Sequence, residues 1–95
     1  MEKHNIITKE KLQKYFNLTE TALEKIKPNI IKGKESEAKE IIEMVENYLS
    51  DAKYFQKNND YVNCFASLNY SHGWIDCGVR TGIFDVNDDR LFTVK

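Results

Sequence analysis

The sequence has 95 residues, of which 41% are hydrophobic and 31% are charged, and its formal net charge at pH 7 is −1. This length fits one domain, and the composition is typical of a folded soluble protein rather than a disordered one. The longest stretch without Asp, Glu, Lys or Arg, residues 61–75, is too short and too polar to span a bilayer.

The first predicted element is a helix over residues 8–27. Apolar and small side chains recur three and four positions apart, which is the spacing of one helix face. We expect Thr8 to be the N-cap, and Pro28 lacks the hydrogen-bond donor that a continuing helix needs. The face consists of Leu12, Tyr15, Thr19, Ala22 and Ile26.

The second predicted helix covers residues 35–57 and has the most regular pattern. Glu35 and Glu37 lie in its first turn, where the helix dipole favours negative charge. The residues KNND then form a turn, with Asp60 as the N-cap of the next helix. The apolar face consists of Ala38, Ile41, Val45, Tyr48, Ala52 and Phe55.

The third predicted helix covers residues 60–81, and the tail over residues 82–95 has no helical period. We expect Phe65, Leu68, His72 and Ile75 to face the first two helices, in a seam that begins at Tyr61 and ends at Val79. Three helices joined by short links predict an all-α single domain over residues 1–95. Its architecture is an antiparallel three-helix up-and-down bundle with a short irregular C-terminal tail.

The third helix is also apolar on the side opposite this seam, where Ala66, Tyr70, Trp74 and Cys77 lie. Burying a large aromatic side chain stabilises a protein by roughly 1.5–3 kcal/mol, so we expect this side to be covered. The interpretation that we favour is a cover formed by the tail after Gly82. The alternatives are a second copy of the chain or a different protein partner.

A polar line on the same helix contains Asn69, His72, Asp76 and Arg80. His72 and Asp76 are four positions apart, as are Asp76 and Arg80, so each pair can be in contact. The line is either a small ligand-binding or enzymatic site, with an imidazole oriented by a carboxylate, or a histidine satisfied by its neighbours within the fold. We favour the second interpretation, because no nucleophile lies at a recognisable spacing.

The remaining patterns argue against several activities. Cys64 and Cys77 are too far apart for a CxxC motif, and the sequence indicates no metal site, no cofactor and no catalytic residues. The lysines of the first helix fit a solvated face, so we do not expect nucleic-acid binding, and without a segment that could span a bilayer we expect no membrane partner. The start of the sequence lacks the apolar core of a signal peptide, which predicts a cytoplasmic protein. We predict a non-catalytic protein-binding or scaffolding module.

Residues 22–29, residues 38–84 and the final RLFTVK resemble the archaeal family of small uncharacterised proteins known as DUF357. The stretch NYSHGWIDCGVR carries the most specific part of this resemblance. The resemblance implies a compact three-helix bundle in an archaeal cytoplasm, and it implies no activity. Cys64 and Cys77 stand where the resemblance leads us to expect alanine, which argues against a role for either thiol.

The hairpin over residues 48–72 is also similar to helix pairs of the HEPN superfamily and of tetratricopeptide repeats. Ribonucleases of the HEPN type use an arginine a few residues before a histidine. No arginine precedes His72 in this sequence, so the ribonuclease chemistry is not supported.

Overall fold

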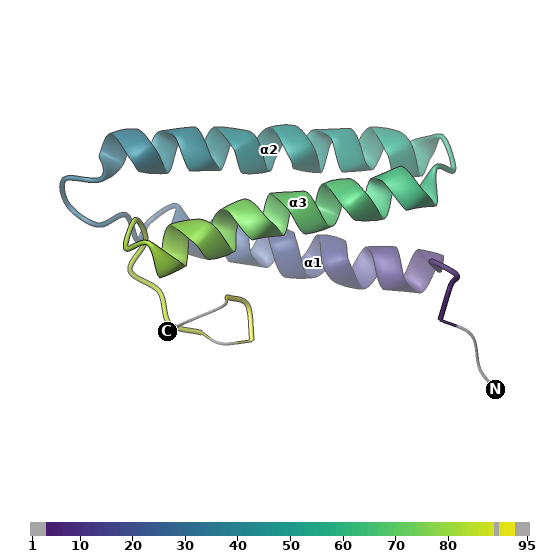
Figure 1. The fold of residues 1–95 in the computed structure, drawn as a ribbon, viewed down its shortest axis with the longest axis horizontal. Coiled ribbons are helices and arrows are strands. Elements are labelled where there is room, and N and C mark those ends of the chain that lie inside the picture. The colour runs from purple at the N-terminus through teal and green to yellow at the C-terminus, as the bar shows by residue number, and fades with distance from the viewer. Residues whose placement is uncertain (1–3, 89, 93–95) are drawn as a thin grey trace.

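Three α-helices make up most of the chain in the computed structural model, which describes residues 4–88 and 90–92. Helix α1 spans Lys9–Ile26, α2 spans Glu35–Lys57 and α3 spans Tyr61–Arg80. Consecutive helices run in opposite directions (Figure 1). The prediction of an all-α, up-and-down three-helix bundle is therefore confirmed.

Local signals in the sequence set the helix ends. The backbone N–H of Lys11 donates to Thr8 Oγ1 over 3.1 Å, and that of Asn63 donates to Asp60 Oδ1 over 3.1 Å. Thr8 and Asp60 are therefore N-caps, as predicted. The predicted helices over residues 8–27 and 60–81 are one residue longer at each end than α1 and α3, because the predictions include the flanking cap residues. Between α2 and α3 the chain turns at Asn59, whose φ of 60° asparagine adopts more readily than most residues.

Helices α2 and α3 pack along lines of small and medium-sized residues that repeat every seven positions on each helix. Small side chains at a helix contact shorten the distance between the helix axes. The hydroxyl of Ser71 lies inside this seam and donates to the carbonyl of Val45 over 3.0 Å, so it is satisfied there. The buried residues of the two lines are Ala38, Val45 and Ala52 on α2, and Cys64, Ser71 and Gly78 on α3.

Helix α1 packs chiefly against α3 and has little contact with α2. The molecule is accordingly flattened, with principal dimensions of 47 × 29 × 16 Å. The side chains that α1 contributes to the core include Leu12, Phe16, Leu23 and Ile26. Among the described residues, no helix has the length and apolar character needed to cross a membrane.

The C-terminal tail closes one end of the bundle. The chain turns at Gly82, whose φ of 79° glycine adopts without strain. The N–H of Ile31, in the linker between α1 and α2, donates to the carbonyl of Ile83 over 3.0 Å. Ile30 and Phe84 form an isolated β-bridge, the only β-type pairing in the described part of the chain. The tail side chains buried in the core are Ile83, Phe84 and Phe92.

Candidate functional site

The imidazole of His72 is held between α1 and the tail. Its Nδ1 lies 3.1 Å from Thr19 Oγ1, and its Nε2 lies 2.6 Å from the carbonyl oxygen of Leu91. A carbonyl oxygen can only accept, so Nε2 carries a proton and donates it to Leu91. In the neutral ring, Nδ1 then accepts from the hydroxyl of Thr19, which is buried. Both ring nitrogens are thus engaged by groups of the chain itself.

The other members of the predicted polar line do not all converge on this ring. Asp76 does lie beside it, with Oδ1 3.8 Å from Nε2 of His72, a distance too long for a hydrogen bond. Asn69 is exposed and lies beside Tyr70 and Trp74 instead. Arg80 is exposed at the end of α3, about two turns of helix beyond His72. The structure therefore places Asp76 beside His72 and Asn69 on a different side of α3.

The two thiols lie in different environments. Cys64 is fully buried in the α2–α3 seam, and burial, with a smaller contribution from the charge of Asp60, raises the pKa of its thiol. Cys77 is exposed, and both cysteines are free. In the part of the chain that the structure describes, no group of three His, Cys, Asp or Glu side chains is placed to hold a metal ion.

A second surface lies on the other side of α3 from His72, next to α2. Tyr70 is 53% exposed, and its ring centroid lies 4.5 Å from that of Tyr48 on α2 and 6.3 Å from that of Trp74. A shallow depression of about 370 Å³ lies along this side and is lined by α3 alone. We define the α3 outer face as Ala66 together with the lining residues Asn69, Tyr70, Gly73, Trp74 and Cys77.

The expectation that the tail covers Tyr70 and Trp74 is not met by the described tail residues. Tyr70 remains exposed and Trp74 is only half-buried. The apolar tail side chains are directed into the core instead, where the ring of Phe84 occupies the space beside Gly78. Residues 89 and 93–95 of the predicted cover lie outside the described residues.

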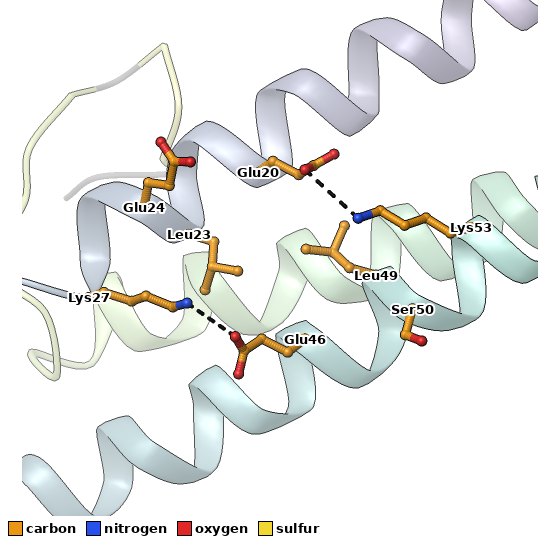
Figure 2. A pocket seen from close by; sticks show the side chains of 8 residues that line it. All are labelled: Glu20, Leu23, Glu24, Lys27, Glu46, Leu49, Ser50 and Lys53. Atoms are coloured by element: carbon orange, nitrogen blue, oxygen red, sulfur yellow. Dashed lines mark hydrogen bonds and ion pairs between the residues drawn. The ribbon is translucent and has the colours of Figure 1, made fainter.

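Sequence reasoning missed a groove between α1 and α2, which has a volume of about 350 Å³ (Figure 2). Two ion pairs cross it, Lys27–Glu46 at 3.1 Å and Glu20–Lys53 at 4.0 Å. All four side chains are about half exposed, and exposed ion pairs contribute little to stability. The groove is lined by Glu20, Leu23, Glu24, Lys27, Glu46, Leu49, Ser50 and Lys53. Its position depends on the register of α1 against α2, which periodicity alone does not reveal.

Sequence reasoning also missed the part of Asp88 in holding the tail. The carboxylate accepts hydrogen bonds from the Arg90 side chain over 3.0 and 3.1 Å, and it pairs with Lys25 of α1 over 3.2 Å. These contacts hold the pKa of the Asp88 carboxyl well below its usual range, and the hydrogen bonds from Arg90 contribute the most to this shift. Asp88 therefore ties the tail to α1 on the same flank as His72.

Comparison with known proteins gives one match. The model of a family described as "Protein of unknown function (DUF357)" matches residues 14–84, which include most of α1 and all of α2 and α3. No curated protein and no solved structure matches the chain.

Proposed function

Because the chain belongs to the DUF357 family, whose function is unknown, we propose a function from the physical character of its surface. The protein is a non-catalytic protein-binding or scaffolding module, and its contact surface is the α3 outer face. The observation that carries this proposal is the exposed Tyr70 beside the half-buried Trp74, on a face that the described tail leaves open. The proposal retains the archaeal and cytoplasmic setting that the family resemblance implies, with residues 1–95 as one domain.

The energetic argument for a partner is the cost of leaving aromatic side chains in water. Tyrosine and tryptophan are enriched at protein interfaces, and they often contribute most of the binding energy. Tyr48 of α2 extends the aromatic surface, since its ring is in contact with that of Tyr70. A partner that covered these rings would gain roughly 1.5–3 kcal/mol for each side chain that became fully buried.

The alternative, a ligand-binding or enzymatic site on Asn69, His72, Asp76 and Arg80, has less support. A general base needs a ring nitrogen within reach of the substrate. Both nitrogens of His72 are occupied, one by a buried threonine hydroxyl and one by a backbone carbonyl. Asn69 lies beside Tyr70 and Trp74 instead, and Arg80 is exposed at the end of α3, which gives a site made of these four residues less support.

The test is a capture experiment with Tyr70→Ser and a matched control. Tyr54 of α2 is 65% exposed and lies outside the α3 outer face, so Tyr54→Ser removes a comparable exposed ring. Immobilised wild-type protein should retain one or more specific proteins from the lysate of the source organism. We expect Tyr70→Ser to lose them and Tyr54→Ser to retain them, with unchanged circular dichroism for both variants. Equal retention by the two variants would refute the α3 outer face as the contact surface.

A further inference from the structure

Helix α3 differs from its neighbours in the charge of its exposed surface. The exposed residues of α3 from Val62 to Cys77 are all uncharged. An uncharged surface with an exposed tyrosine is characteristic of the centre of a protein interface, where charged residues are depleted. The exposed surface of α2, by contrast, carries Glu35, Glu37, Lys39, Glu40, Glu43, Glu46, Asp51, Lys53 and Lys57.

Gly73 has no packing role within the described chain. It lies in the interior of α3, where glycine is a poor helix former, and a Cβ built on it meets no atom within 4 Å. Gly78 is different, because a Cβ there would lie 2.5 Å from the ring of Phe84. A glycine that internal packing does not require suits the close approach of an outside backbone. Ala66 precedes Gly73 by seven positions, the same repeat that brings α2 and α3 together.

We propose that the α3 outer face binds the same face of a second copy of the chain, with the two α3 helices antiparallel across a two-fold axis. This inference rests on the proposed function, because it names the partner of that surface. An axis at the middle of the face places Ala66 opposite Gly73 of the partner subunit. It also places Val62 opposite Cys77 of the partner subunit, since the members of each pair are equally far from the axis. Small residues therefore meet small residues where the helices come closest.

The choice of a second copy follows from charge. A two-fold contact brings each part of a surface against the same surface of the partner, so a face with one predominant charge would repel itself. The exposed part of α2 is dominated by glutamates, which would meet like charge in such a contact. The exposed residues of α3 between Val62 and Cys77 carry no charge, and the partly buried Asp76 lies beside His72 on the opposite flank, so the outer face can pack against itself without repulsion.

The size of the contact sets its strength. The sixteen residues from Val62 to Cys77 extend for about 24 Å at 1.5 Å per residue. A strip of this length and one helix wide is smaller than the roughly 800 Å² per partner of a standard interface. The dimer is therefore a weak one that depends on protein concentration.

Sedimentation equilibrium of the full chain, from about 1 μM to about 1 mM, tests this inference. Ala66→Glu and Gly73→Lys should each weaken the dimer by at least about tenfold, because each places an unpaired charge in the contact. Thr21→Glu, at an exposed position on α1, is the matched control and should leave the dimer unchanged. Circular dichroism of each variant establishes that it is folded.

Two double variants of equal bulk test the register. The first double variant combines Ala66→Glu with Gly73→Lys, and in the antiparallel contact each new carboxylate then lies opposite a new ammonium group of the partner. The second combines Ala66→Lys with Gly73→Lys, so that ammonium groups lie opposite each other. We expect the first double variant to dimerise about tenfold more tightly than the second at low salt, and the difference to shrink at high salt.

Two results would overturn the inference. A wild-type chain that stays monomeric over the whole concentration range excludes a second copy as the partner. The proposed function survives that result if capture from the lysate still depends on Tyr70. A wild-type dimer for which the two double variants bind equally well excludes the antiparallel contact. Capture that is insensitive to Tyr70→Ser would instead refute the proposed function itself, so the two failures are distinguishable.

Discussion

Replacing Gly78 by alanine should destabilise the protein, whereas replacing Gly73 by alanine should stabilise it. Both glycines lie in α3, and both exchanges add one methyl group and improve helix propensity by about 1 kcal/mol. The exchanges differ in what the new methyl group meets. At Gly73 it meets nothing within 4 Å, whereas at Gly78 it would lie 2.5 Å from Phe84 Cε2 and 3.2 Å from Ile41 Cδ1.

The magnitude follows from how little the ring of Phe84 can move. Its side chain is 2% exposed and packs in the core, so it cannot turn into solvent without opening the end of the bundle. Overpacking of this kind costs about 1–3 kcal/mol, from which the gain in helix propensity of about 1 kcal/mol is subtracted. Gly78→Ala should therefore lower the free energy of unfolding by about 0–2 kcal/mol. Gly73→Ala should raise it by about 1 kcal/mol, which corresponds to about 4–8 °C in Tm.

Urea denaturation followed by far-ultraviolet circular dichroism, at a protein concentration where the wild type is monomeric, measures both changes. The two variants should differ by about 1–3 kcal/mol in the free energy of unfolding. Phe84→Leu makes room beside Gly78, so the effect of Gly78→Ala should be smaller in that background than in the wild type. Equal effects of the two glycine substitutions would show that the contact between Phe84 and Gly78 is not present.

Three further predictions concern the flank of His72 and the two thiols. Thr19→Val should lower the free energy of unfolding by about 1–3 kcal/mol in urea denaturation, because Nδ1 of His72 loses its donor; an unchanged value would contradict the hydrogen bond. Asp88→Asn should lower the urea midpoint near neutral pH, and its difference from wild type should narrow as the pH falls below about 4. The reason is that a carboxyl whose pKa is lower in the folded state stabilises the fold above its unfolded-state pKa, and this stabilisation is lost as the carboxylate is protonated in acid. A difference in urea midpoint that does not change with pH would contradict the role of Asp88. A thiol reagent should modify Cys77 rapidly and Cys64 only on unfolding, since Cys64 is fully buried; two fast thiols in the folded protein would contradict this.

The helices were predictable because their signals are local. The three- and four-residue spacing of apolar side chains fixes where each helix lies, and Thr8 and Asp60 mark two of the starts with their capping side chains. The flanks of α3 were harder to assign. The predicted seam through Phe65 and His72 follows the flank next to α1, where Phe65 meets the ring of Tyr15 and His72 meets Thr19.

Helix α3 has its most extensive contact with α2, and this contact involves residues that hydropathy does not mark as core. Ser71 is polar and Gly78 has no side chain, yet both are buried in the seam. They are accommodated there because the partner helix presents Ala38 and Ala52 at the same seven-residue repeat. This complementarity between two helices has no signature in the pattern of either helix alone. A comparison of the seven-residue repeat of small residues on α2 with the one on α3 could have indicated this contact.

The position of the tail depends on polar groups as much as on apolar area. The prediction that the tail covers Tyr70 and Trp74 considered only the burial of apolar area. Those rings can remain in contact with water at a moderate cost in free energy. The side chain of His72 is 17% exposed, and its Nε2–H needs an acceptor. The carbonyl of Leu91 provides one because the tail runs along the flank next to α1. The contact between Asp88 and Lys25 holds the tail on that same flank. A tail that satisfies His72 therefore leaves the α3 outer face open, which is why a surface so poor in charge is available to a partner.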